Sequence, residues 1–439
     1  MYSLFTAKLL VLIILINAIL TPYIVLSIPD IIVSYMVVDL GDVYDYGTVF
    51  TIDDKVVIPF FSVNRYYSGL IVEVDIGSRS YYKTFIANYT PFFAVPLNST
   101  YYLVLANSKE KPNIVYCLVV KRGGVAEPVY VSRVINLSYT LITSRYIVYG
   151  KSILFTLHDG LNASLVNITL TNNWFEIHIV RGLPNILAPP TIYNDTVVWG
   201  YFIVLNNTIV SRVDKVFEKF GSINMFITEE EAFNNYIAYI VMDAYSEENL
   251  TYLYVYDPIN EVFVDKRVFK GEVVALQSYN NTLYLGAQYI TYNRINMSIW
   301  SYNALNKTLK ELVGEDNAYD VLIAQSNRYW LTMIPTDSLT LIDLINEKTY
   351  TFEFNEEKLG FTRTIYTRRI ILSQVKSLVE KDINLYWVLP TPITIYVFKI
   401  SLIELIKALP ENPLLAYVLL TTVVFIITYT YRKHKNSTH

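Results

Sequence analysis

The chain has little of the chemistry on which many enzymes depend. It has one cysteine, Cys117, in 439 residues, so an intrachain disulfide is excluded and a hydrophobic core must hold the fold. Of its four histidines, only His158 and His178 lie before the last ten residues, and neither stands at metal-ligand spacing from another ligand. No glycine-rich phosphate loop or calcium loop is present. We therefore expect no metal and no cofactor.

Charged residues are also few, whereas aromatic residues are abundant. Charged residues make up 17% of the chain and the formal net charge is −4, so no broad basic surface is expected and nucleic acid is an unsuitable partner. Apolar residues make up 53%, with 39 tyrosines and 21 phenylalanines. Aromatic and β-branched residues favour strands, so the composition predicts an all-β protein.

Both ends of the chain carry long apolar runs. Residues 1–27 hold Lys8 and then an apolar stretch, which indicates a signal peptide or an uncleaved N-terminal anchor. Residues 410–431 include Leu414 to Tyr431, which has no charge and is long enough to cross a bilayer; a buried core helix is the alternative. The basic tail at 432–439 should be cytoplasmic, so residues 28–409 form an ectodomain of a single-pass membrane protein.

Acceptor sequences for N-linked glycans support an exterior location. Chance pairing of asparagine with serine and threonine would produce roughly five Asn-x-Ser/Thr sequences, about half of those present. Asparagine and threonine richness alone is the alternative explanation. The acceptors are Asn88, Asn98, Asn136, Asn162, Asn167, Asn194, Asn206, Asn249, Asn280, Asn296 and Asn306.

Pairs of alternating apolar runs recur along the chain, each with a polar break. Leu253 to Phe269 has its break at Asp257 to Glu261, where proline fixes φ and aspartate and asparagine bond their own backbone. This pattern predicts a β-hairpin. Similar hairpins are expected at Leu70–Phe85, Ile299–Leu312 and Leu339–Phe354. A short apolar second strand should precede each hairpin, as at Tyr102–Leu105 and Tyr146–Tyr149.

These units repeat about every 45 residues, as the blades of a β-propeller do. The chain from about Tyr35 to Ser401 resembles the general propeller repeat, in which an apolar strand ending in aspartate precedes a tight turn. We expect seven or eight blades, with Ile31 to Leu40 supplying the outer strand of the last blade and closing the ring. Two β-sandwiches in tandem are the alternative, although they need no 45-residue period.

Candidate ligand-binding residues are acidic or aromatic. Asp39, Asp42, Tyr44 and Asp45 lie within seven residues and can bind a sugar or Ca²⁺. The aromatic residues Tyr66, Tyr67 and Tyr289 lie in expected loops beside amide or charged residues. Glu229 to Glu231 and Glu247 to Glu248 are expected to be solvated loop charges.

Two functions follow from this reading. The first is a cell-surface binding or scaffolding protein whose partner is a surface glycan or an envelope protein. Its many glycan acceptors without disulfides resemble archaeal surface proteins. The second is an extracellular glycosidase or lyase that uses paired carboxylates about 5–10 Å apart at the channel mouth. A transmembrane sensor is disfavoured, since only about eight residues follow the membrane segment.

Overall fold

A computed structural model describes most of the chain. The described residues are 31–62, 68–136, 141–142, 145–158, 162–171, 174–183, 186–221, 224–243, 250–291, 294–318, 323–332, 338–361, 374–375 and 377–408. The Cα positions divide the chain into a larger unit, residues 34–381 with 386–399, and a smaller unit, residues 1–33, 382–385 and 400–439.

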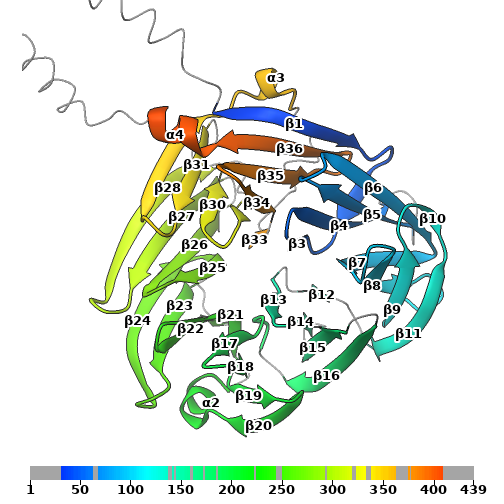
Figure 1. Cartoon of the computed structure of the whole chain (residues 1–439). Helices are drawn as coiled ribbons and strands as arrows, with labels where there is room; N and C mark the ends of the chain where they lie inside the picture. Colours follow the sequence, from blue (N-terminus) through cyan, green and yellow to red (C-terminus); the bar gives the residue numbers. More distant parts are fainter. Residues whose placement is uncertain are drawn as a thin grey trace, which may run out of the picture. The chain divides into compact units, whose positions relative to one another are not determined.

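The described strands form eight sheets that follow one another along the chain, and we number them as blades 1 to 8 (Figure 1). Blade 1 contains β2 (Tyr44–Tyr46), β3 (Phe50–Ile52), β4 (Lys55–Ser62), β5 (Ser68–Asp75), β6 (Ser80–Ala87) and β10 (Gly124–Ala126). Blade 2 contains β7 (Tyr89–Pro96), β8 (Tyr101–Ser108), β9 (Ile114–Lys121) and β11 (Pro128–Asn136). Blade 3 contains β12 (Leu141–Ile142), β13 (Ile147–Tyr149), β14 (Ser152–His158), β15 (Ala163–Leu170) and β16 (Phe175–Leu183). Blade 4 contains β17 (Thr191–Tyr193), β18 (Thr196–Trp199), β19 (Phe202–Leu205) and β20 (Thr208–Arg212).

The remaining four sheets are blades 5 to 8. Blade 5 contains β21 (Met225–Phe233), β22 (Tyr236–Asp243), β23 (Leu250–Asp257) and β24 (Val262–Lys270). Blade 6 contains β25 (Glu272–Tyr279), β26 (Thr282–Thr291), β27 (Arg294–Asn303) and β28 (Thr308–Ala318). Blade 7 contains β29 (Ile323–Gln325), β30 (Tyr329–Thr332), β31 (Ser338–Asp343), β32 (Lys348–Glu353) and the parallel β33 (Gln374–Val375). Blade 8 contains β34 (Leu378–Lys381), β35 (Asn384–Pro390), β36 (Thr394–Ser401) and β1 (Ile32–Asp39).

The chain is therefore an eight-bladed β-propeller, as the 45-residue period predicts. β1 pairs with β36, so the strand expected from Ile31 to Leu40 does complete the last blade. Eight separate sheets rule out two stacked β-sandwiches. The expectation that Tyr146 to Tyr149 form the second strand of their blade is wrong. Residues Tyr146 to Tyr149 include β13, and the second strand of blade 3 is the following β14.

Three of the four expected hairpin turns share one hydrogen-bonding pattern. In blade 5, Oδ1 of Asp257 accepts from the backbone N–H groups of Ile259 and Asn260, at 2.9 and 3.0 Å. Asn303 and Asp343 make the equivalent bonds in blades 6 and 7. The residue after each bonded pair then adopts positive φ, as at Glu261 (53°). This side-chain bond to the backbone sets the register of each hairpin.

Apolar side chains pack between neighbouring blades. The ring of Phe93 in blade 2 lies 5.9 Å from Phe50 in blade 1 and 5.0 Å from Phe155 in blade 3, measured between centroids. Further clusters join blades 3 to 5, 5 to 6, 6 to 7, and 8 to 1. Trp387 of blade 8 contacts Phe354, which follows blade 7, at 6.0 Å. Apolar contacts thus continue from each blade to the next, and no blade has to bury its apolar face alone.

Helices are few and short in the part of the chain that the structure describes. The described ones are α2 (Asp214–Phe220), α3 (Glu356–Leu359) and α4 (Leu402–Ala408), and among the described residues no helix has the length and apolar character that a bilayer crossing requires. Within the smaller unit, Ser401 donates its backbone N–H to Ile31 at 2.8 Å, and α4 follows directly. The predicted N-terminal segment at 1–27 and the predicted membrane segment at 410–431 lie outside the described residues.

Candidate functional site

The larger unit contains a cavity of about 840 Å³ that is lined by residues from five blades, and we call it the central cavity. Blades 1 and 3 contribute Phe50, Thr51, Ile52, Asp53, Tyr146, Val148, Gly150, Lys151, Ile153 and Leu170. Blades 6, 7 and 8 contribute Tyr279, Gln325, Ser326, Asn327, Arg328, Ile345, Leu378, Val379 and Glu380. Its size is that of a small-ligand site, and it draws on strands far apart in the sequence.

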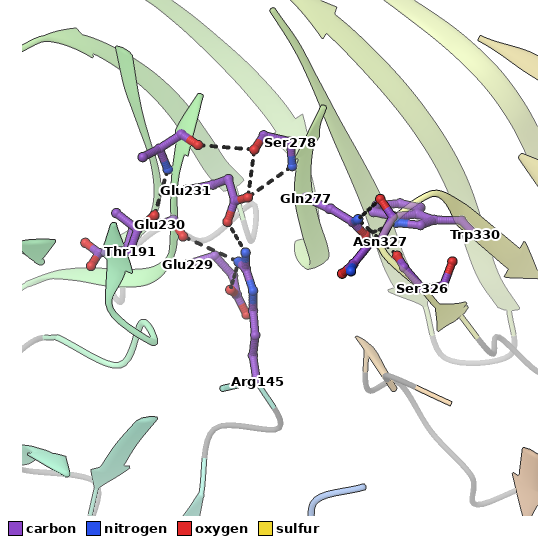
Figure 2. A network of polar contacts seen from close by, with 11 residues as sticks. Arg145, Thr191, Glu229, Glu230, Glu231, Gln277, Ser278, Ser326, Asn327 and Trp330 are labelled. Carbon is purple, nitrogen blue, oxygen red and sulfur yellow. Dashed lines mark hydrogen bonds and ion pairs between the residues drawn. The ribbon is translucent and has the colours of Figure 1, made fainter. Parts of the chain in front are cut away.

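The turn from β29 to β30 forms one wall of this cavity and is held from both sides. From blade 6, Nε2 of Gln277 donates to the carbonyl oxygens of Ser326 and Asn327, at 3.0 and 3.1 Å. From blade 8, Oε1 of Glu380 accepts a 2.6 Å hydrogen bond from the Ser326 hydroxyl. Figure 2 shows Gln277 beside Ser326, Asn327 and Trp330. These bonds fix the position of the turn.

A buried ionic cluster lies next to the cavity. Arg145, 7% exposed, donates to Oε2 of Glu229 at 3.2 Å and also bonds Oε2 of Glu231. Oε1 of Glu231 accepts from the N–H and the hydroxyl of Ser278, at 3.1 and 2.8 Å (Figure 2). Blades 3, 5 and 6 are joined in this way. Because Tyr146 follows Arg145 and Tyr279 follows Ser278, the cluster also positions two cavity residues.

Burial dominates the electrostatics of this cluster. It raises the pKa of Glu229 to about 7, even though Arg145 acts in the opposite direction. Glu230 is fully buried, and burial raises the pKa of its carboxyl well above the ordinary value. Oε2 of Glu230 accepts a 2.7 Å bond from the backbone N–H of Gly200. The three glutamates are thus structural groups inside the propeller, and the expectation that they are solvated loop charges is wrong.

The acidic residues expected to form a cluster near the first blade, Asp39, Asp42 and Asp45, instead bond nearby backbone N–H groups. Oδ1 of Asp39 accepts from the N–H of Gly41 at 3.0 Å, and Oδ1 of Asp42 from that of Val43 at 2.8 Å. Asp45 bonds the N–H of Tyr46 in the same way, at 2.9 Å. Tyr44 is buried against Phe60. None of these four residues lines the central cavity. In the described part of the chain, no group of three or more His, Cys, Asp and Glu side chains is arranged to hold a metal ion.

The aromatic candidates lie elsewhere. Tyr289 lines a groove of about 540 Å³ together with Asn296, Trp300, Lys270 and other residues of blades 5 and 6. The ammonium of Lys270 lies 5.2 Å from the centre of the Tyr289 ring. Tyr289 lies within β26, opposite Asn296 of β27, so the expectation that it lies in a loop is wrong. Tyr66 and Tyr67 lie outside the described residues.

The expected glycan acceptors differ in exposure. Asn167 lies within β15 and is half-buried, and its Nδ2 donates to Oδ1 of Asn207 at 2.6 Å. Asn296 is also half-buried, while Asn249 lies outside the described residues. The exposed acceptors are Asn88, Asn98, Asn136, Asn162, Asn194, Asn206, Asn280 and Asn306.

The residues that build the cavity were missed by the sequence analysis. Gln325, Asn327 and Tyr279 carry no motif and lie in short segments that look like ordinary strand ends. One signal was present for the ionic cluster. Successive side chains of a strand point to opposite faces of the sheet, so three consecutive glutamates cannot all face water when both faces are packed. A strand assignment for Met225–Phe233 would therefore have implied a buried cation or hydrogen-bond donors for these carboxylates.

Comparisons with known proteins show similarity of shape only. Neither protein-family models nor curated proteins match the chain. Solved structures with similar folds include an uncharacterized protein from Listeria monocytogenes, at 11% identity and a TM-score of 0.39, covering 71% of this chain and 95% of that one. A chain of the mitotic checkpoint complex matches at 11% identity, a TM-score of 0.42, and coverage of 73% and 92%. The dihydro-heme d1 dehydrogenase NirN matches at 12% identity, a TM-score of 0.41, and coverage of 68% and 64%. The fold assignment rests on sheet order, and no activity follows from these similarities.

Proposed function

We propose that this chain is a single-pass cell-surface protein whose propeller lies outside the cell and binds a ligand in the central cavity. The observation that carries the binding role is the cavity itself. Five blades contribute to it, and hydrogen bonds from Gln277 and Glu380 hold its wall in place. A pre-formed cavity with a few fixed polar groups suits binding, because its side chains lose little conformational freedom when a ligand enters.

The location outside the cell is supported by the sequence and by the exposure of the acceptors. An uncharged segment followed by Arg432, Lys433 and Lys435 suits a membrane anchor with a cytoplasmic tail. Eight of the acceptor asparagines are exposed in the structure, where an attached glycan would meet no packed side chain. The absence of disulfides is compatible with an exterior protein of this size, since the blades bury a continuous apolar core.

An enzymatic role would depend on carboxylates in the same cavity. Asp53 and Glu380 both line it and both are exposed. One oxygen of Glu380 already accepts from Ser326, which suits a positioning role better than proton transfer. The buried glutamates of blade 5 are bonded to Arg145, Ser278 and Gly200. Binding is therefore the function that the geometry supports best.

A topology experiment tests the proposal. Cells expressing the full-length chain with a C-terminal tag are treated with an external protease, and their membranes are then washed with alkaline carbonate. We expect the tag to stay in the membrane fraction and the propeller to be cut on intact cells. A chain released by carbonate, or one cut only after the cells are opened, would contradict the proposal.

A further inference from the structure

Ile383 stands at a turn position that is polar in other blades. It is 55% exposed and follows Asp382, whose φ is 54°, in the two-residue turn from β34 to β35. Such turns favour glycine, asparagine and aspartate, because these residues tolerate positive φ and are easily hydrated. In five other blades the turn that enters the second strand has a polar residue at this position: Asp54, Lys151, Asp195, Asn235 and Asn281. The turn itself therefore does not explain an exposed isoleucine.

A second exposed isoleucine, Ile403, adjoins Ile383 within the smaller unit. Ile403 lies in α4 and is 38% exposed, whereas Leu405 of the same helix is buried. The backbone N–H of Leu402 donates to the carbonyl oxygen of Ile383 at 3.2 Å, so the start of α4 lies beside the turn. We call Ile383 and Ile403 the aliphatic patch. Isolated exposed apolar residues are common, and this patch gains significance from where the chain continues.

The chain reaches the proposed membrane segment a short distance after the aliphatic patch. α4 ends at Ala408, and the uncharged segment begins at Leu414. Even a fully extended chain, at about 3.6 Å per residue, covers only about 20 Å between these two residues. A segment that spans the bilayer from Leu414 therefore keeps α4 and the patch near the outer leaflet. Apolar side chains held at that distance are stabilised by entering the lipid interface.

The glycan acceptors are distributed unevenly around the propeller. All of the expected acceptors lie between Asn88, at the junction of blades 1 and 2, and Asn306 in blade 6. The segments 32–87 and 308–401, which form nearly all of blades 7, 8 and 1, contain no Asn-x-Ser/Thr sequence. These three blades are neighbours, as the contact of Trp387 with Phe354 and the ion pair of Lys381 with Asp54 show. A bulky glycan cannot occupy a surface that lies against lipid, so this distribution fits a membrane-facing side.

We propose that the aliphatic patch enters the outer leaflet of the membrane that anchors the chain, and that blades 7, 8 and 1 form the side of the propeller nearest the lipid. Blades 2 to 6, which carry the acceptors, point away from it. Charges of both signs flank the patch in the sequence, Lys381 and Asp382 beside Ile383 and Glu404 and Lys407 beside Ile403, so the contact does not require anionic lipid. This inference rests on the proposed function, because it assumes that the segment from Leu414 spans the membrane. It adds the surface by which the protein meets lipid.

The test uses the full-length protein in phosphatidylcholine vesicles, with a fluorescent maleimide on one introduced cysteine. The native Cys117 is buried and should stay unlabelled. Ile383→Cys and Ile403→Cys place the probe in the aliphatic patch. Leu305→Cys is the matched control, because Leu305 is 67% exposed at a turn of blade 6 and precedes the acceptor Asn306. Lipids with a nitroxide on the upper acyl chain should quench both patch probes at least about twofold and leave the control probe unchanged.

Flotation of the vesicles after a carbonate wash separates this inference from the proposed function. If the chain floats but the patch probes are quenched only by aqueous iodide, the membrane anchor stands and the inference is wrong. Patch probes shielded from both quenchers would mean that a second copy or another protein covers the patch, which would also overturn it. Equal quenching of the Leu305→Cys probe would overturn the assignment of blades 7, 8 and 1 as the side nearest the lipid. A chain that does not float would overturn the proposed function and the inference with it.

Discussion

Nε1 of Trp330 donates a 2.6 Å hydrogen bond to Oε1 of Gln277, and this contact joins blade 7 to blade 6. The same Gln277 donates from Nε2 to the carbonyl oxygens of Ser326 and Asn327. One amide thus satisfies a fully buried indole and fixes the turn that lines the central cavity. Stability and the shape of the site depend on the same side chain.

Gln277→Leu should therefore destabilise the protein by about 1–3 kcal/mol, because the buried indole N–H of Trp330 loses its acceptor. Gln277→Glu keeps an acceptor for the indole but sets a carboxylate oxygen against the carbonyl oxygens of Ser326 and Asn327, so its cost should shrink when a lower pH protonates the carboxyl. The measurement is the free energy of unfolding of the full-length protein in detergent at pH 7 and pH 4. A cost of Gln277→Leu below about 0.5 kcal/mol would show that the indole bond contributes nothing.

The Arg145 cluster predicts a pH dependence of stability. Burial raises the pKa of Glu229 to about 7, so the folded protein holds this proton more tightly than the unfolded chain does. Stability from this group is present at low pH and is lost as the pH rises from about 4.5 to about 7. The free energy of unfolding of the wild type, relative to Glu229→Gln, should fall across this window by up to about 1.4 kcal/mol per pH unit.

Glu218→Gln controls for the loss of a carboxylate as such, since Glu218 lies on α2 with its side chain 65% exposed. A difference between the wild type and Glu229→Gln that does not change over this pH window would contradict the prediction.

Two equivalent turn aspartates should differ in importance. Asp257 and Asp343 make the same turn bonds, but Asp257 is half-buried, whereas Asp343 is 3% exposed and also pairs with Arg328. Burial acts to raise the pKa of Asp343, but hydrogen bonds from Arg328 and Asn346 outweigh it and hold the pKa below its ordinary value. Asp343→Ala should cost about 2–3 kcal/mol, and Asp257→Ala should cost clearly less.

Both variants should respond to pH in the same direction, because hydrogen bonds from the side chain and the backbone N–H of Asn260 also hold the pKa of Asp257 below its ordinary value. Because the pKa of Asp343 is lowered in the folded state, its contribution is present above the unfolded pKa, near 4, and is lost as the pH falls through the folded value. Thermal unfolding at pH 7 and pH 3 should show the cost of Asp343→Ala shrinking at the lower pH. A cost that is independent of pH would contradict this account of the turn.

The repeat was predictable from the sequence, while the site was not. The hairpins at Asp257, Asn303 and Asp343 are local, because side chain and turn lie within four residues, and so the sequence pattern carries them. The pairing of β1 with the last blade was also predictable, because an eighth blade otherwise lacked an outer strand. The central cavity joins Phe50, Tyr146, Tyr279, Gln325 and Glu380, whose proximity depends on the angle between blades and not on any local pattern.

The same distinction explains the two errors. Tyr146 to Tyr149 has the alternating pattern of a second strand, but this part of blade 3 pairs with β14 as a short inner segment. Glu229 to Glu231 looked solvated because no cation lies nearby in the sequence. Their partner, Arg145, is 84 residues from Glu229 and reaches it only in the folded propeller. Periodicity predicts strands, but it carries no information about such long-range pairs.

Glycan occupancy should follow the exposure of the acceptors if the propeller lies outside the cell. Exposed turn residues such as Asn194 and Asn306 should be modified when the chain is made in its own type of cell. Asn167 should stay unmodified, because its amide is bonded to Asn207 within the sheet. Mass spectrometry of tryptic peptides measures each site. A glycan on Asn167, or no glycan on any exposed acceptor, would contradict the prediction.

Because the chain has a single cysteine, thiol labelling can test whether the propeller lies outside the cell and binds a ligand in the central cavity. Cys117 is buried, and burial raises the pKa of its thiol to about 12, so a maleimide should not label it. Asn327→Cys places a thiol at the rim of the cavity, while Val125→Cys places one at a position 84% exposed and away from it.

The decisive measurement is the labelling rate of these two variants by a membrane-impermeant maleimide, on intact cells and on purified protein. The account predicts that both variants are labelled on intact cells. It also predicts that only Asn327→Cys reacts more slowly on cells than after purification, because on cells a bound ligand fills the central cavity. Labelling of neither until the cells are opened would place the propeller inside. Equal rates for Asn327→Cys on cells and after purification would show that nothing binds the cavity there.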